Sequence, residues 1–116
     1  VLGSRGLGDV YKDRLRLRED GWQIDAALAV EDAPVFDKPG FGSPALIEYL
    51  RSLPALEGVE FIGLCTDICV ISNAMVLRAA FPETEIEIQS DCCAGVTPRS
   101  HQTALDAMRN CQFTIV

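Results

Sequence analysis

Cys69 is the residue of this sequence best placed for covalent chemistry. The apolar run from Val59 to Leu64 predicts a buried strand, and a helix is expected to begin near Asp67. The Cys69 thiol would then lie in the first turn of a helix, just beyond the carboxyl end of a strand. The positive helix end and its free N–H groups stabilise a thiolate, and the same groups can hold the oxyanion formed when a carbonyl is attacked. The alternative role, a small buried hydrophobe, is the usual one for a free cysteine.

The other four cysteines are less suited to nucleophilic attack: Cys65, Cys92, Cys93 and Cys111. Cys65 stands at the end of the strand, before the helix dipole can act on it. Cys92 and Cys93 are expected in a loop after a strand, and Cys111 follows a helix, where the dipole disfavours a thiolate. The sequence has no Cys-x-x-Cys pair and a single histidine, so a zinc site has few ligands to draw on.

Lys38 is the candidate partner of the thiol. It follows the short apolar run Pro34–Phe36, which we interpret as a strand. If that strand lies beside 59–64, Lys38 reaches the same edge of the sheet as the thiol. An ammonium there would stabilise a thiolate and could donate to a reacting group. Phe41, in the same Pro-Gly turn, could form an apolar wall for a flat ring. A surface lysine and ordinary loop packing of Phe41 are the alternatives.

Asp67 and Asp91 flank the same predicted edge, and His101 is a further polar candidate. Asp67 is expected to cap the helix that carries the thiol, because its carboxylate can accept from free N–H groups. His101 lies near the start of a later helix, on the side shared with Leu105 and Met108. A hydrogen-bonded core or capping histidine is therefore expected, rather than a Cys–His dyad. Asp91 flanks the edge without an assigned role.

Capping residues and apolar spacing predict the elements that hold these groups. Ser43 and Pro44 are expected to begin a helix that Pro54 ends. The other predicted elements are a helix over 67–81, a strand over 84–89, a helix begun by Thr97 and Pro98, and a strand over 113–116. Strands alternating with helices predict a parallel sheet with right-handed crossovers.

Composition limits the class of partner. The chain has 116 residues, enough for one domain or part of one, with 48% hydrophobic and 23% charged residues. A net charge of −7 disfavours nucleic acid and anionic membrane surfaces. No apolar run is long enough to span a membrane, and the N-terminal residues lack the apolar core of a signal peptide. Five cysteines without a secretory signal favour a reduced, cytoplasmic location.

Three segments, in order, resemble the isochorismatase-like cysteine hydrolases, a family that includes nicotinamidases. Gly-Leu-Cys-Thr-Asp-Ile-Cys-Val at 63–70 resembles the nucleophile motif, and Asp-Lys-Pro-Gly-Phe-Gly-Ser at 37–43 resembles the segment with the family's lysine. Asp-Cys-Cys-Ala-Gly at 91–95, with Ser-His at 100–101 and 104–108, resembles the C-terminal stretch. The resemblance implies a three-layer α/β/α, Rossmann-like fold with a mainly parallel sheet, running from about Gly21 to the end.

The resemblance also implies a reaction. Cys69, in a triad with Lys38 and an aspartate, would attack the carboxamide carbon of a small amide such as nicotinamide, and water would hydrolyse the thioester. The N–H groups of Cys65 and Cys69 would form the oxyanion hole, after a cis peptide between Leu64 and Cys65. The candidate substrate-binding residues are Phe41, Trp22 and Leu64. Vinyl ether hydrolysis of the isochorismatase type is a weaker alternative, because it does not need a cysteine nucleophile.

The sequence departs from the family at its beginning. The Asp-Met-Gln-like strand that carries the family's aspartate is absent, as are the Asp-x-His and further histidines of metal-binding nicotinamidases. Residues 1–20 resemble no family segment, so we expect 21–116 to be the C-terminal part of one hydrolase domain, shortened by truncation or a frameshift. No cofactor is expected in this chain, since a zinc-type site would lie in the missing portion. The alternative is a non-catalytic remnant that at most binds a small molecule.

Oligomerisation is a separate expectation. The predicted helix over 68–81 is apolar on most of its circumference, and a homo-oligomer contact would cover such a surface. A second layer of core within one subunit is an equal alternative.

Overall fold

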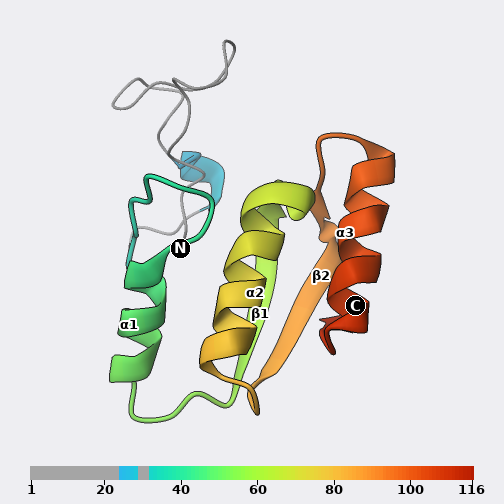
Figure 1. Ribbon diagram of the computed structural model, residues 1–116. Helices are drawn as coiled ribbons and strands as arrows, with labels where there is room; N and C mark the ends of the chain where they lie inside the picture. Colours follow the sequence, from blue (N-terminus) through green and yellow to red (C-terminus); the bar gives the residue numbers. More distant parts are fainter. Residues whose placement is uncertain (1–23, 29–31) are drawn as a thin grey trace.

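The computed structural model describes residues 24–28 and 32–116 (Figure 1). Its elements follow one another as 3-10 helix η3 (Ala26–Leu28), α1 (Pro44–Ser52), β1 (Gly58–Leu64), π-helix η4 (Thr66–Val70), α2 (Ile71–Ala80), β2 (Glu85–Ala94), α3 (Pro98–Asn110) and β3 (Thr114–Ile115). The three strands of the described part form one sheet in the order β1-β2-β3. Both strand pairs are parallel, which confirms the predicted parallel α/β fold.

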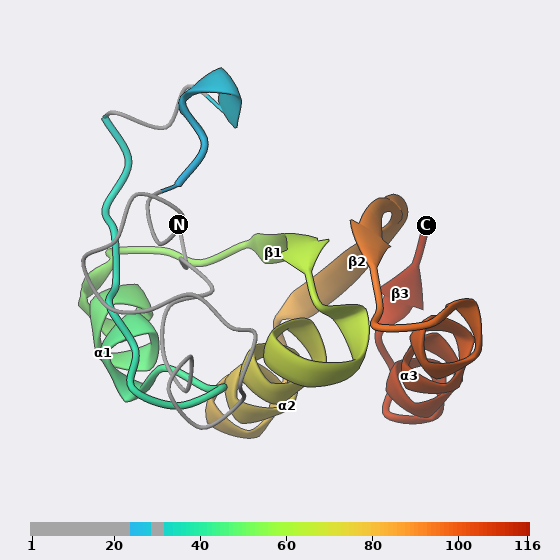
Figure 2. The same cartoon turned by 90° about the horizontal axis from the view of Figure 1, so that it is seen from above.

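The core lies between the sheet and the helices. Figure 2 shows α2 and α3 on the same face of the sheet, with α1 beside α2. The strands contribute Phe61, Ile86 and Ile88 to this core, and the helices contribute Leu77 and Met108. Leu105 is buried as well, so the apolar stripe predicted for the last helix is confirmed. On β1, Ile62 and Leu64 keep 62% and 58% of their surface exposed.

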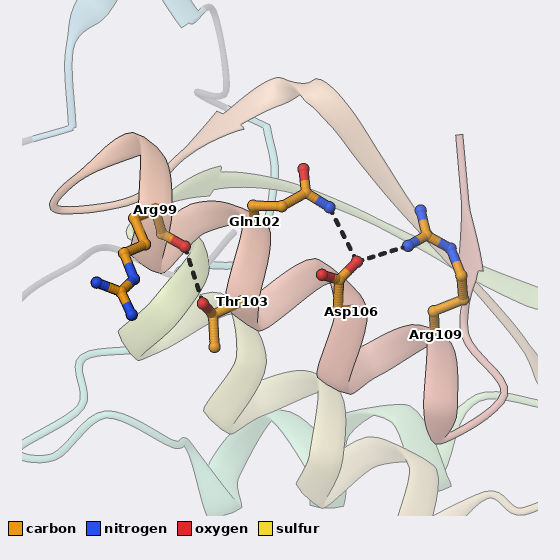
Figure 3. A network of polar contacts seen from close by, with 5 residues as sticks. All are labelled: Arg99, Gln102, Thr103, Asp106 and Arg109. Atoms are coloured by element: carbon orange, nitrogen blue, oxygen red, sulfur yellow. Dashed lines mark hydrogen bonds and ion pairs between the residues drawn. The ribbon is translucent and has the colours of Figure 1, made fainter.

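The side of α3 that faces away from the core carries a network of polar side chains. Figure 3 shows its members, which are Arg99, Gln102, Thr103, Asp106 and Arg109. The carboxylate of Asp106 accepts from the Gln102 amide and from the Arg109 guanidinium, both at 2.9 Å. These pairs are three and four residues apart on an exposed helix face. Each such pair stabilises a helix by only about 0.2–0.5 kcal/mol. The network therefore marks the outer face of the helix rather than a site.

The helix starts predicted at Ser43 and Thr97 are confirmed. The Ser43 hydroxyl accepts from the Leu46 N–H at 3.3 Å, and Pro44 occupies the first turn of α1. Thr97 and Ser100 form a capping box at the start of α3. Local sequence fixes these ends because each cap is made within a few residues. None of the helices in the described part is long and apolar enough to cross a membrane.

The second strand is longer than the sequence predicted. Cys92 and Cys93, expected in a loop, lie within β2. The register runs from Phe61 opposite Ile88 to Gly63 opposite Cys93, so β2 carries extra residues in an irregularity between them. The alternation of apolar residues stops at this irregularity, which is why the pattern ended the strand too early.

The prediction of a strand over Pro34–Phe36 is wrong. Phe36 makes only an isolated β-bridge, and the segment is otherwise irregular. Its ring packs against Tyr49 of α1, with 5.3 Å between the ring centroids. Pro34 has no N–H to donate to a strand ladder, which weakens strand formation here. The following segment therefore reaches the site as a loop rather than from a strand end.

Gly95 is the position where the fold depends on the absence of a side chain. A Cβ atom there would lie 2.8 Å from the backbone N and 2.9 Å from the Cα of His101. We expect Gly95→Ala to push the start of α3 away and to reduce the free energy of unfolding by about 1–3 kcal/mol. Urea unfolding followed by circular dichroism measures this. Gly40→Ala is the matched control, since its added Cβ would have no heavy atom of the described residues within 4 Å beyond its chain neighbours. Equal midpoints for the two variants would contradict the close packing.

Candidate active site

The structure brings Lys38 and Cys69 together. The Lys38 Nζ donates to the Cys69 Sγ at 3.4 Å and to the Gly40 carbonyl at 3.2 Å. Lys38 is 4% exposed, whereas the Cys69 side chain is only partly buried. The two residues are 31 positions apart in the sequence, and the loop that contains Lys38 brings them together at η4, just before α2.

The burial of Lys38 has an electrostatic consequence. An ammonium removed from water is costly unless an opposite charge and good acceptors replace its hydration. A carbonyl oxygen supplies one acceptor, and a thiolate at Cys69 would supply the opposite charge. A cation at hydrogen-bond distance is the kind of neighbour that stabilises a thiolate, so the geometry is suited to an ammonium–thiolate pair.

The turn that carries Cys69 follows β1 directly. The peptide between Leu64 and Cys65 is cis, as the family resemblance implied. The Cys65 carbonyl then accepts from the N–H groups of Ile68 and Val70, at 3.0 and 3.1 Å, and closes the turn. This turn, Thr66–Val70, is π-helical and continues into α2, so the predicted helix begins with a wider turn than expected. Cys69 lies in that opening turn, near the positive end of the helical segment.

Two residues of this turn bind the beginning of α3. Thr66 is fully buried, and its hydroxyl lies 2.8 Å from the Nδ1 of His101. His101 is thus hydrogen-bonded within the fold, the role the sequence favoured for it. The Asp67 carboxylate accepts from the N–H of Val96 at 3.1 Å. The prediction that Asp67 caps the helix is wrong, because the cap residue is Cys65 and its side chain makes no capping bond. The Asp67 carboxylate instead joins its own backbone N–H to that of Val96 in another loop.

The Asp67 contacts predict how stability depends on acid. Burial alone would raise the pKa of Asp67, but hydrogen bonds from Ser100 and from the Val96 N–H, with nearby His101, hold it below its usual 3.8. A carboxyl with a lowered folded-state pKa stabilises the fold above about pH 3.8, and this contribution is lost as the pH falls through the folded-state value. We expect wild type to lose more stability than Asp67→Asn between about pH 5 and about pH 3. Urea midpoints at both pH values test this, and equal losses would contradict it.

The candidate substrate-binding residues are placed differently. Phe41 is partly buried in the Lys38 loop, and Leu64 is exposed at the end of β1. Trp22 lies outside the described residues. Asp91 is exposed in β2. Phe41 therefore shares a loop with Lys38, and Leu64 ends the strand that precedes the turn with Cys69.

Asn73 is a residue that the sequence analysis missed. It is 2% exposed, and its amide binds the backbone of Phe41, Ser43 and Cys69. A polar residue four positions after the cysteine, inside a mostly apolar helix, was the signal that could have identified it.

The surroundings of the remaining cysteines differ from those of Cys69. Burial raises the pKa of the Cys93 thiol more than the hydrogen bond from the Gly63 N–H lowers it, and neighbouring Cys92 raises it further. Cys92 and Cys111 are exposed. Across residues 24–28 and 32–116, no three His, Cys, Asp or Glu side chains gather as a metal site would require.

Comparison with known proteins identifies the class. The isochorismatase domain family matches residues 4–116, and the chain belongs to this family of isochorismatase-like hydrolases. No curated protein matches the chain significantly by sequence.

Solved structures of similar fold include three amidases. The pyrazinamidase/nicotinamidase of Streptococcus mutans is 27% identical, with a TM-score of 0.64 over 78% of this chain and 52% of its own. The nicotinamidase of Staphylococcus aureus is 25% identical, with a TM-score of 0.63 over 77% of this chain and 60% of its own. The zinc-bound pyrazinamidase of Pyrococcus horikoshii, 20% identical, shares the fold at a TM-score of 0.73 over 99% of this chain and 70% of its own. The chain thus spans about half to three fifths of the first two.

Proposed function

We propose that this chain belongs to a cysteine hydrolase of small amides such as nicotinamide, which acts through a thioester on Cys69 assisted by Lys38. The observation that carries the proposal is the buried Lys38 ammonium at 3.4 Å from the Cys69 sulfur. The names of the similar amidases support a heteroaromatic carboxamide as the substrate class.

The chemistry needs few groups. The Cys69 thiolate attacks the carboxamide carbon, and the resulting oxyanion is held by the N–H groups of Cys65 and Cys69. The C–N bond then breaks as the nitrogen takes up a proton from water and leaves as ammonia. Water attacks the thioester, the C–S bond breaks, the carboxylic acid and the thiolate are released, and one proton returns to the solvent. Lys38 keeps the sulfur ionised before attack and after release.

Substrate contacts come from both sides of this pair. Phe41, in the same loop as Lys38, supplies an apolar wall against which a flat ring can pack. Leu64, at the end of β1, completes the proposed binding surface, and Trp22 is a further candidate that only the family resemblance implies. The substrate carbonyl would then point toward the turn that follows β1, where the two N–H groups of the oxyanion hole lie.

Binding without turnover is the second candidate. The sequence has no aspartate in an Asp-Met-Gln-like strand motif, which is the group the family uses to move the proton between thiol and leaving amine. A chain that keeps the cysteine and lysine without that carboxylate would form a thioester only from esters whose leaving group needs no proton.

Two substrates separate the candidates. The chain is incubated with nicotinamide, and with the 4-nitrophenyl ester of the same acid, whose leaving group departs without protonation. Hydrolysis is supported by ammonia and nicotinic acid in equal amounts, together with an acyl mass on the Cys69 peptide. An acyl mass from the ester without ammonia from the amide favours the second candidate. Acylation of neither kind would contradict the hydrolase proposal and would leave binding alone as the candidate.

A further inference from the structure

We infer that Asn73 is the positioning residue that holds the Lys38 loop on the helix and so sets the contact between Lys38 and Cys69. The inference concerns the proposed catalytic pair and rests on that proposal for its importance. The inference adds to the proposed function a residue that sets the geometry of the pair through backbone contacts alone.

The Asn73 amide joins the two segments directly. Its Oδ1 accepts from the N–H of Ser43, and its Nδ2 donates to the carbonyls of Phe41 and Cys69, all at 2.8 Å. The first two partners lie in the Lys38 loop, and the third is the backbone of the nucleophile itself. One side chain therefore ties the segment before α1 to the residue that carries the thiol.

The amide is completely used and cannot exchange partners with water. Asn73 is 2% exposed, and both donor hydrogens and the carbonyl oxygen have a partner. Loss of the side-chain amide would remove one hydrogen bond from each of three backbone groups, of which the Ser43 N–H is buried and the other two are partly buried. Such groups are costly to leave unpaired, so the loop would move to find other partners.

The loop lies flat on α2 around this amide. A Cβ atom on Gly42, between Phe41 and Ser43, would meet the Val76 side chain at 3.7 Å and the Ser72 carbonyl at 4.0 Å. Ser43 also caps α1, so the same loop end is held from its other side. Lys38 stands only a few residues before these contacts. The position of its Nζ relative to the Cys69 sulfur therefore depends on the loop contacts that Asn73 makes.

The movement predicted for the loop separates ammonium from sulfur. The thiolate of Cys69 would then lose the cation that stabilises it, whereas the thiol itself would stay reachable. The ratio of iodoacetamide labelling rates at about pH 7 and about pH 10 isolates this effect, because nearly every thiol is ionised at the higher pH and accessibility cancels. Peptide mass spectrometry follows Cys69 separately from the other cysteines.

Asn73→Leu is the main variant, since it removes the three bonds at a similar volume. We expect the labelling ratio of Cys69 to fall about tenfold, and Asn73→Gln, which keeps an amide, to retain more of it. Asn73→Ala leaves room for water at the backbone groups. It replaces Asn73→Leu in the labelling measurement if the leucine variant does not fold. Leu77→Ala, fully buried on the same helix, is the control for lowered stability and should keep the wild-type ratio.

A double variant decides whether the effect passes through Lys38. In the Lys38→Met background, Asn73→Leu or Asn73→Ala should lower the ratio no further. An unchanged ratio in the single variants, or an undiminished fall in the double variant, would overturn the inference. The readout needs no substrate, so failure to release ammonia from nicotinamide would count against the proposed function and leave this result standing.

Discussion

Replacing Cys69 by alanine should reduce hydrolysis of nicotinamide to the uncatalysed rate. In the proposed mechanism the thioester forms on this sulfur, which the Lys38 ammonium contacts at 3.4 Å. We expect a loss of about 10³-fold or more, measured as ammonia release, because nucleophile and oxyanion stabilisation act as one unit. Acylation by the 4-nitrophenyl ester should disappear in parallel.

A serine at the same position sharpens this first prediction. Cys69→Ser keeps the size and the hydrogen-bonding group, but a hydroxyl is far less ionised than a thiol near neutral pH, so it too should be inactive. Cys111→Ala is the matched control, since this thiol is exposed after α3 and should leave the rate unchanged. Retention of more than about a tenth of the activity in Cys69→Ala would contradict a thioester on this residue.

Lys38→Met should have the second largest effect, on the reactivity of the thiol itself. The methionine fills a similar volume without the charge, so the thiolate loses the donor at 3.4 Å. A charge-assisted contact of this kind is worth about 1.5–3 kcal/mol. We therefore expect labelling of Cys69 at about pH 7, relative to about pH 10, to fall at least about tenfold.

Two comparisons make the Lys38 result specific. Lys38→Arg keeps the positive charge in a planar group that cannot take the same position, and it should retain part of the ratio. Lys38→Met should also leave the fold intact, because it removes a buried charge rather than creating one. An unchanged labelling ratio in Lys38→Met would show that the ammonium does not stabilise the thiolate.

The sequence was most informative where a local contact decides the structure. Ser43 and Thr97 predicted helix starts correctly because each cap is completed within one turn of the chain. The β1 strand and the parallel order followed from apolar runs and their spacing. The pairing of Lys38 with Cys69 was anticipated from motif order, although through a strand at 34–36 that the structure does not contain.

Residues whose partners lie far along the chain were not predictable in the same way. The Asp67 carboxylate was expected to cap its own helix, but it accepts a hydrogen bond from the Val96 N–H of a distant loop. Asn73 bonds a loop 30 to 32 residues earlier, which no local pattern records. The irregularity in β2 depends on its pairing with β1, so it could not be identified from β2 alone.

Limited alkylation of the folded chain tests the central claim most directly. A small amount of iodoacetamide is added near neutral pH, and the label on each of the five cysteines is followed over time by peptide mass spectrometry. Accessibility by itself predicts that Cys92 and Cys111, the exposed thiols, react first. We predict instead that the partly buried Cys69 is labelled ahead of them. Equal labelling of all five, or Cys69 trailing the exposed pair, would contradict a thiolate held by Lys38.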